Sequence, residues 1–200
     1  MIPKVEFRYS YIYDEVYKNS SEIKKFLKKT NKKYPSREET IGFRNRFEVF
    51  WRGEERKILR KILEVTGLNW KEKRIICYVV GVCRPMSDPM TIRVFHDMEY
   101  AVDMITHELI HNLQINIEDN KWKKWQRYID SKYSDVSDTT KAHIFLNAVH
   151  KKIYLELFDK ERLRRDLYES NKALDYKNSW KIVEKEGYES IIRKFRELTK

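Results

Sequence analysis

Three residues in the middle of the chain, His107, Glu108 and His111, form the motif HExxH. On an α-helix, residues four apart lie on one face, about 6 Å from each other along the axis. His107 and His111 can therefore offer two imidazole nitrogens to one metal ion, and Glu108 can reach a water molecule bound to that ion. The motif thus predicts a site at which a metal ion and a carboxylate act on the same water. The alternative is a helix with two structural histidines and an incidental glutamate.

The residues around the motif predict the helix that must carry it. Ile105, Leu109 and Leu113 recur at four-residue steps on a stripe beside the histidines. Such a helix can be buried on its apolar side while both histidines face a cleft. Asp97 is a candidate N-cap for this helix, which we expect to begin near Met98.

Two β-strands are expected before the motif helix. Residues 74–83 (RIICYVVGVC) form a β-branched and aromatic run, and residues 91–95 (TIRVF) form a second one. Residues 85–89, with a proline at each end, must form the turn or loop between them. Cys77 and Cys83 are expected to be small buried residues rather than a redox pair.

The order of strand, strand and HExxH helix resembles the zincin metallopeptidases, over about residues 74–157. The resemblance implies an α+β fold that is mostly helical, with a small sheet packed on the active-site helix and further helices at both ends of the chain. It also implies that His107 and His111 bind one catalytic Zn²⁺ ion and that Glu108 is the general base. An edge strand at 91–95 would pair with the backbone of the substrate.

A catalytic zinc site typically has a third protein ligand, and the sequence narrows its identity. The extended metzincin motif requires glycine at position 114 and histidine at 117, and Gln114 and Ile117 exclude that group. The gluzincin-like enzymes, which share the element order seen here, place a glutamate on a second helix downstream. By that resemblance we expect His150 to occupy the slot, with Glu156 and His143 as the alternatives.

The second helix is expected over residues 138–158, and it carries several polar side chains on one stripe. His143, Asn147, His150 and Tyr154 follow one another along this stripe at steps of three and four. The apolar neighbours of His150 predict that its ring points inward. His143 lies two turns from His150, about 10 Å away, which is too far to share one metal. His143 and Tyr154 are therefore candidates for contacts with the substrate or the transition state, with structural packing as the alternative.

Length and composition bound the remaining expectations. The chain has 200 residues, 36% of them charged, and no apolar run near 18 residues, so we expect no membrane span. The N-terminus lacks the apolar region of a signal peptide, which predicts a cytoplasmic protein with reduced thiols. Few glycines, prolines and glutamines beside many lysines and glutamates resemble a thermophile's composition.

The domain organisation is expected to follow a change in residue types near residue 70, where a helical pattern gives way to β-branched and aromatic residues. Residues 1–70 are expected to form an N-terminal helical region, with one helix over 10–30 and a capping box at Ser36 and Glu39. Residues 71–200 would form the zincin-like catalytic region. A chain of this length also suits a single compact domain.

Together these features predict a zinc metallopeptidase that hydrolyses peptide bonds in a peptide or protein substrate. The net charge of +11 is dispersed along the chain, which is typical of solvated helix faces and also allows attraction to nucleic acid. One alternative is therefore a DNA-associated zinc protease, similar to the SprT-like group. The other is a non-catalytic helical interaction protein.

Overall fold

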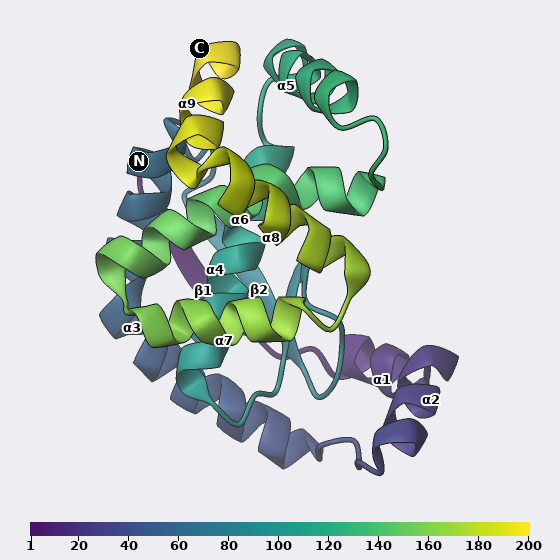
Figure 1. Cartoon of the computed structure of the whole chain (residues 1–200). Coiled ribbons are helices and arrows are strands. Elements are labelled where there is room, and N and C mark those ends of the chain that lie inside the picture. The colour runs from purple at the N-terminus through teal and green to yellow at the C-terminus, as the bar shows by residue number, and fades with distance from the viewer. The chain divides into compact units, whose positions relative to one another are not determined.

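The computed structural model describes residues 1–200 and consists of nine α-helices and one small four-stranded mixed sheet (Figure 1). This confirms the expected α+β class with a mostly helical chain. The chain divides into two compact units, residues 1–56 with 71–112 and residues 57–70 with 113–200. Each unit thus combines segments from both sides of residue 70. No helix has the length and apolar character needed to cross a membrane.

The sheet belongs to the first unit and has the strand order β1-β2-β4-β3. β1 pairs with β2 and β2 with β4 in parallel, whereas β3 is antiparallel to β4. The strands are β1 (Lys4–Arg8), β2 (Arg74–Val80), β3 (Met86–Ser87) and β4 (Met90–Arg93). The presence of β1 corrects the expectation of an N-terminal region made of helices alone. Val5 and Phe7 point to the buried face and are β-formers, which gives this short segment its alternating pattern.

The sheet edge differs from the expected one. β4 lies between β2 and β3, with Thr91 opposite Met86 and Met90 opposite Ser87. The expectation that residues 91–95 form the edge strand is therefore wrong, because the segment before them turns back and adds the short strand β3. Backbone groups at the start of β4 are already engaged by β3, so this part of β4 has no edge to offer a substrate.

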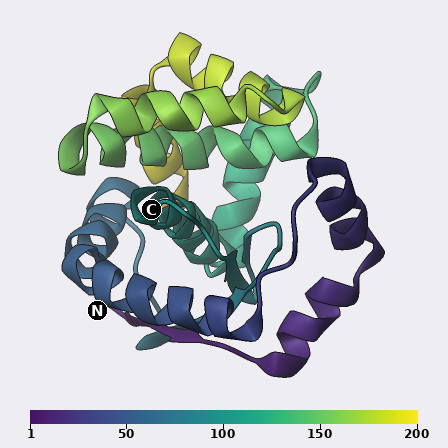
Figure 2. The same cartoon turned by 90° about the horizontal axis from the view of Figure 1, so that it is seen from below.

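Three helices follow β1: α1 (Tyr11–Asn19), α2 (Ser21–Thr30) and α3 (Arg37–Thr66). The expected single helix over 10–30 is broken at Ser20, whose extended backbone ends α1 and whose hydroxyl accepts the amide of Ile23 as the N-cap of α2. The predicted capping box of α3 is confirmed, because Ser36 and Glu39 each accept the backbone amide of the other. In Figure 2 the purple-to-blue ribbon can be followed from β1 through these helices.

Aromatic side chains of α3 form the core of the first unit against β1. Phe43, Phe47 and Trp51 recur every four residues and are buried, which places them on one helix face. The Phe43 and Phe47 rings stack at 5.5 Å, and Phe47 meets the edge of Phe7 from β1 at 5.2 Å. The amide of Val5 also donates to the Glu55 carboxylate at 2.7 Å, which ties β1 to α3.

The second unit is a helical bundle built around α6. Its helices are α5 (Asp119–Lys132), α6 (Asp138–Leu157), α7 (Lys160–Ser170), α8 (Leu174–Glu186) and α9 (Tyr188–Thr199). α7, α8 and α9 all pack on α6 (Figure 1). Phe145 of α6 stacks on Phe195 of α9 at 3.6 Å, and Trp125 of α5 meets the edges of both rings. A helix covered on several sides must be apolar on several faces, which explains the many buried residues of α6.

Candidate metal centre

The HExxH motif lies in the second half of α4 (Met98–Ile115). The predicted N-cap is confirmed, because the Asp97 carboxylate accepts the amides of Glu99 at 2.8 Å and Tyr100 at 3.1 Å. Ile105 and Leu109 of the predicted apolar stripe are fully buried. With this stripe buried, α4 presents His107 and His111 on its opposite, more accessible face.

His107 and His111 lie side by side on α4, one helical turn apart. Their ring centroids are 5.0 Å apart and their planes make an angle of 70°. Both side chains are half-buried, so they are accessible without being fully solvated. Two imidazoles in this arrangement can direct one nitrogen each toward a common ion.

A third histidine, His143 of α6, is a possible partner of this pair in holding a metal ion. One nitrogen from each of His107, His111 and His143 lies within 4.8 Å of the other two. The Nδ1 atom of His143 is 2.7 Å from the carbonyl oxygen of Thr139. A carbonyl can only accept, so Nδ1 carries the proton and the lone pair is on Nε2, which is how metal-binding histidines are usually oriented. Three imidazoles with this spacing could hold a metal ion.

The structure does not bring His150 into this group. Its side chain is fully buried in the middle of α6 and stacks on Tyr154, with ring centroids 4.3 Å apart. Burial, together with the nearby Arg162, lowers the pKa of His150 to about 3, so the ring is neutral. Its Nδ1 lies 3.6 Å from the Asp166 carboxylate, which is too long for a hydrogen bond and is no ion pair with a neutral ring.

The spacing of His143 and His150 on α6 separates their possible roles. The two residues are seven apart, about 10 Å along the axis, so only one of them can reach a given ion. His143 lies one turn from the start of α6, while His150 is enclosed by the apolar centre of the bundle.

The two other predicted residues of α6, Glu156 and Tyr154, make contacts within the fold. Glu156 pairs with Lys61 at 3.0 Å and with Lys152 at 2.8 Å, and these lysines lower the pKa of its carboxyl. Tyr154, expected as a substrate contact, has no exposed surface and packs against His150. Neither residue belongs to the histidine group.

Glu108 is buried beside the histidine pair, with 7% of its surface exposed. Burial raises the pKa of its carboxyl to about 7, and the positive charge of Arg84 opposes part of this shift. Burial also raises the pKa values of the Cys77 and Cys83 thiols, and the Glu108 carboxyl adds to both shifts. The two cysteines are buried and free, as predicted. A buried carboxyl of this kind can accept and return a proton near neutral pH.

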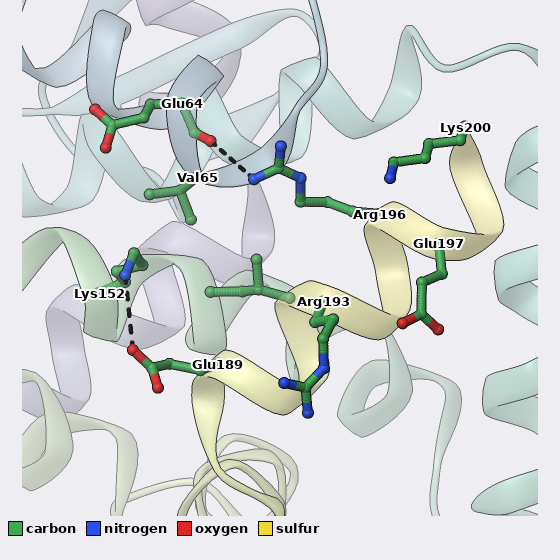
Figure 3. A pocket seen from close by; sticks show the side chains of 9 residues that line it. Glu64, Val65, Lys152, Glu189, Arg193, Arg196, Glu197 and Lys200 are labelled. Carbon is green, nitrogen blue, oxygen red and sulfur yellow. Dashed lines mark hydrogen bonds and ion pairs between the residues drawn. The ribbon is translucent and has the colours of Figure 1, made fainter.

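A separate hollow of about 460 Å³ lies in the second unit, between α9 and the end of α3 (Figure 3). Arg196 donates to the carbonyl oxygen of Glu64 at 3.4 Å, and Lys152 lies 3.8 Å from the Glu189 carboxylate. Acidic and basic side chains here largely compensate each other. The hollow contains no histidine or cysteine and offers no further metal centre.

No family model matches the sequence, and neither the curated proteins nor the solved structures contain a match to the chain.

Proposed function

We propose that this protein is a zinc-dependent peptidase that hydrolyses peptide bonds with Glu108 as the general base. The observation that supports this most directly is the pair of imidazoles, His107 and His111, one turn apart on α4 with a buried carboxyl beside them. His143 is the proposed third ligand, since its nitrogen lies within 4.8 Å of theirs. Three histidines and one open position are a ligand set that catalytic zinc sites use.

Each residue of the site has a defined part in this proposal. The three histidines would hold Zn²⁺, which when bound supplies Lewis acidity toward the attacking water and the carbonyl oxygen. The Glu108 carboxylate accepts one proton from the water as the new C–O bond forms at the peptide carbonyl. The protonated Glu108 then donates this proton to the amide nitrogen as the C–N bond breaks, so the amine leaves uncharged and the carboxylate is restored.

Metal analysis of the purified protein tests the ligand set. We expect one zinc per chain after dialysis against zinc, measured by mass spectrometry of the metal, and a loss of affinity of more than about a hundredfold for His111→Ala and His143→Ala. His150→Gln should retain the metal, and His96→Gln, whose ring is exposed, is the matched control. Full zinc occupancy in His143→Ala would remove His143 from the ligand set, and no zinc in the parent would refute the site.

Peptide cleavage tests the base. Glu108→Gln keeps the size of the side chain and should keep the zinc, but it should lower kcat by about a factor of 10²–10⁴ because the amide accepts no proton. A quenched fluorescent peptide library and the zinc content of the same samples give both readouts. Parent-like cleavage by Glu108→Gln would show that another group is the base. Zinc binding without cleavage by the parent would favour a non-catalytic metal-binding protein.

A further inference from the structure

A cavity of about 780 Å³ lies in the first unit, and none of its residues belongs to the histidine group. Its lining comes from α2, the segment between α2 and α3, the residues just after β2 and β4, and the start of α4. β2 and β4 are parallel, so their carboxyl ends open on the same side. This is where open sheets with parallel strands commonly bind ligands, and the volume is in the range of small-molecule sites.

Much of the cavity wall is apolar. The apolar lining includes Phe26, Leu27, Tyr34, Pro35, Val82 and Phe95. Phe26 exposes 39% of its surface, although it is a large aromatic side chain next to other apolar groups. A wall of this kind favours a ligand with a ring-sized apolar body, because the contact removes apolar surface from water on both sides.

The tyrosine in this wall is held in place before any ligand binds. Tyr34 donates its hydroxyl proton to the buried carboxylate of Asp14 at 2.5 Å, and the same carboxylate accepts the amide of Gly81 at 2.8 Å. A Cβ atom at Gly81 would lie only 2.4 Å from the Tyr34 ring, so the ring sits directly on the glycine backbone. A wall ordered in this way loses little conformational freedom on binding.

Three cations of the cavity, Lys32, Lys33 and Arg93, form no ion pair with a carboxylate, whereas Lys18 is paired with Glu15. Arg93 is half-buried at the end of β4, with its guanidinium 5.1 Å from the centroid of the Phe95 ring. A guanidinium held against an apolar wall is well suited to pair with a carboxylate through two parallel hydrogen bonds.

The acidic side chains of the cavity are directed to backbone amides. Glu39 accepts the amide of Ser36 in the capping box of α3. Asp97 accepts the amides of Glu99 and Tyr100 at the start of α4. Both carboxylates are held at helix starts, and the lining has four cationic side chains against these two anionic ones, so the charge of the cavity is positive overall.

We infer that this cavity binds a small organic anion of the aromatic carboxylate class. The apolar body of the ligand contacts the wall that includes Tyr34 and Phe95, and its carboxylate pairs with Arg93, with Lys32 and Lys33 at the rim. The inference goes beyond the proposed peptidase activity and does not depend on the metal centre.

Amide chemical-shift titration by nuclear magnetic resonance tests the inference with naphthoate and its neutral analogue naphthalenemethanol. We expect saturable binding of naphthoate with shifts centred on Gly81, Val82 and Phe95, and an affinity at least about tenfold higher than that of naphthalenemethanol. Arg93→Gln should abolish this tenfold preference while leaving the neutral probe unchanged. Arg193→Gln, in the separate hollow of the second unit, is the matched control and should change neither affinity.

Three results would overturn the inference: no saturable binding of naphthoate, equal affinity for both probes in the parent protein, or shifts centred outside the cavity. An undiminished preference for the anion in Arg93→Gln would also overturn the role of Arg93 as the anchor. These outcomes are independent of zinc content and of cleavage, so failure of the peptidase proposal leaves this test intact.

Discussion

Lowering the pH from 7 to 5 should destabilise the fold through His150. This imidazole is fully buried and neutral, and burial lowers its pKa from the ordinary value of 6.5 to about 3. Below pH 6.5 the unfolded chain binds a proton at His150 that the folded chain refuses, so the free energy of unfolding falls as the pH falls. This loss begins near pH 6.5 and continues down to about pH 3.

The size of the effect follows from the two pKa values. At pH 5 the unfolded imidazole is almost fully protonated and the folded one almost fully neutral, which reduces the free energy of unfolding by about 2 kcal/mol. For a chain of this length, that corresponds to a decrease in Tm of about 4–8 °C. Other groups also titrate between pH 7 and pH 5, so the effect of His150 is measured as the difference between the parent protein and a variant that lacks this imidazole.

Urea denaturation at pH 7 and pH 5, with a chelator present throughout, isolates the contribution of His150. The parent should lose about 2 kcal/mol more between the two pH values than His150→Gln, because glutamine does not titrate. His96→Gln is the matched control and should follow the parent, since this histidine is exposed in the folded chain. Equal losses in the parent and in His150→Gln would mean that the folded protein accommodates the charged imidazole, contrary to its burial.

Three further predictions concern the fold, each measured as the free energy of unfolding in urea. Gly81→Ala should destabilise the protein by about 1–3 kcal/mol, because the added Cβ would lie 2.4 Å from the Tyr34 ring. Gly53→Ala is the control and should stabilise the protein by about 0.5–1 kcal/mol, because Gly53 is an exposed helix residue with nothing within 4 Å of the added Cβ. Equal effects of the two substitutions would contradict the steric argument. Ser36→Ala should cost about 1 kcal/mol through the lost capping box, and no loss would mean that water replaces the cap. Phe47→Ala should cost about 3–5 kcal/mol, and a loss below 1 kcal/mol would show that the cavity collapses.

The motif helix could be predicted because all of its signals are local. The HExxH spacing, the apolar stripe and the cap at Asp97 lie within one segment, and each depends only on helix geometry. β1 could not be predicted in the same way. Its five residues become a strand by pairing with β2, which begins far along the chain, and no local pattern specifies that partner.

The two histidines of α6 show the same limit at the level of the site. His143 and His150 lie on one stripe of α6, and the sequence places both near the expected ligand position. Both side chains are buried. His150 is enclosed in the apolar centre of the bundle, whereas His143 keeps 7% of its surface exposed near the helix start and donates to the carbonyl oxygen of Thr139. The apolar neighbours of His150 correctly predicted that its ring points inward. A buried position alone does not distinguish a metal ligand from a structural histidine.

The parallel pairing of β1 with β2 has a consequence during synthesis of the chain. Lys4 pairs with Arg74 and Arg8 with Tyr78, so each residue of β1 must wait for a partner that is made 70 residues later. At about 5–20 residues per second this delay lasts several seconds, in which β1 presents unpaired backbone groups to its surroundings. Lys4, Glu6 and Arg8 alternate along this strand with its two apolar residues. These charges are suited to keep the nascent segment from pairing with strands of other chains while it waits.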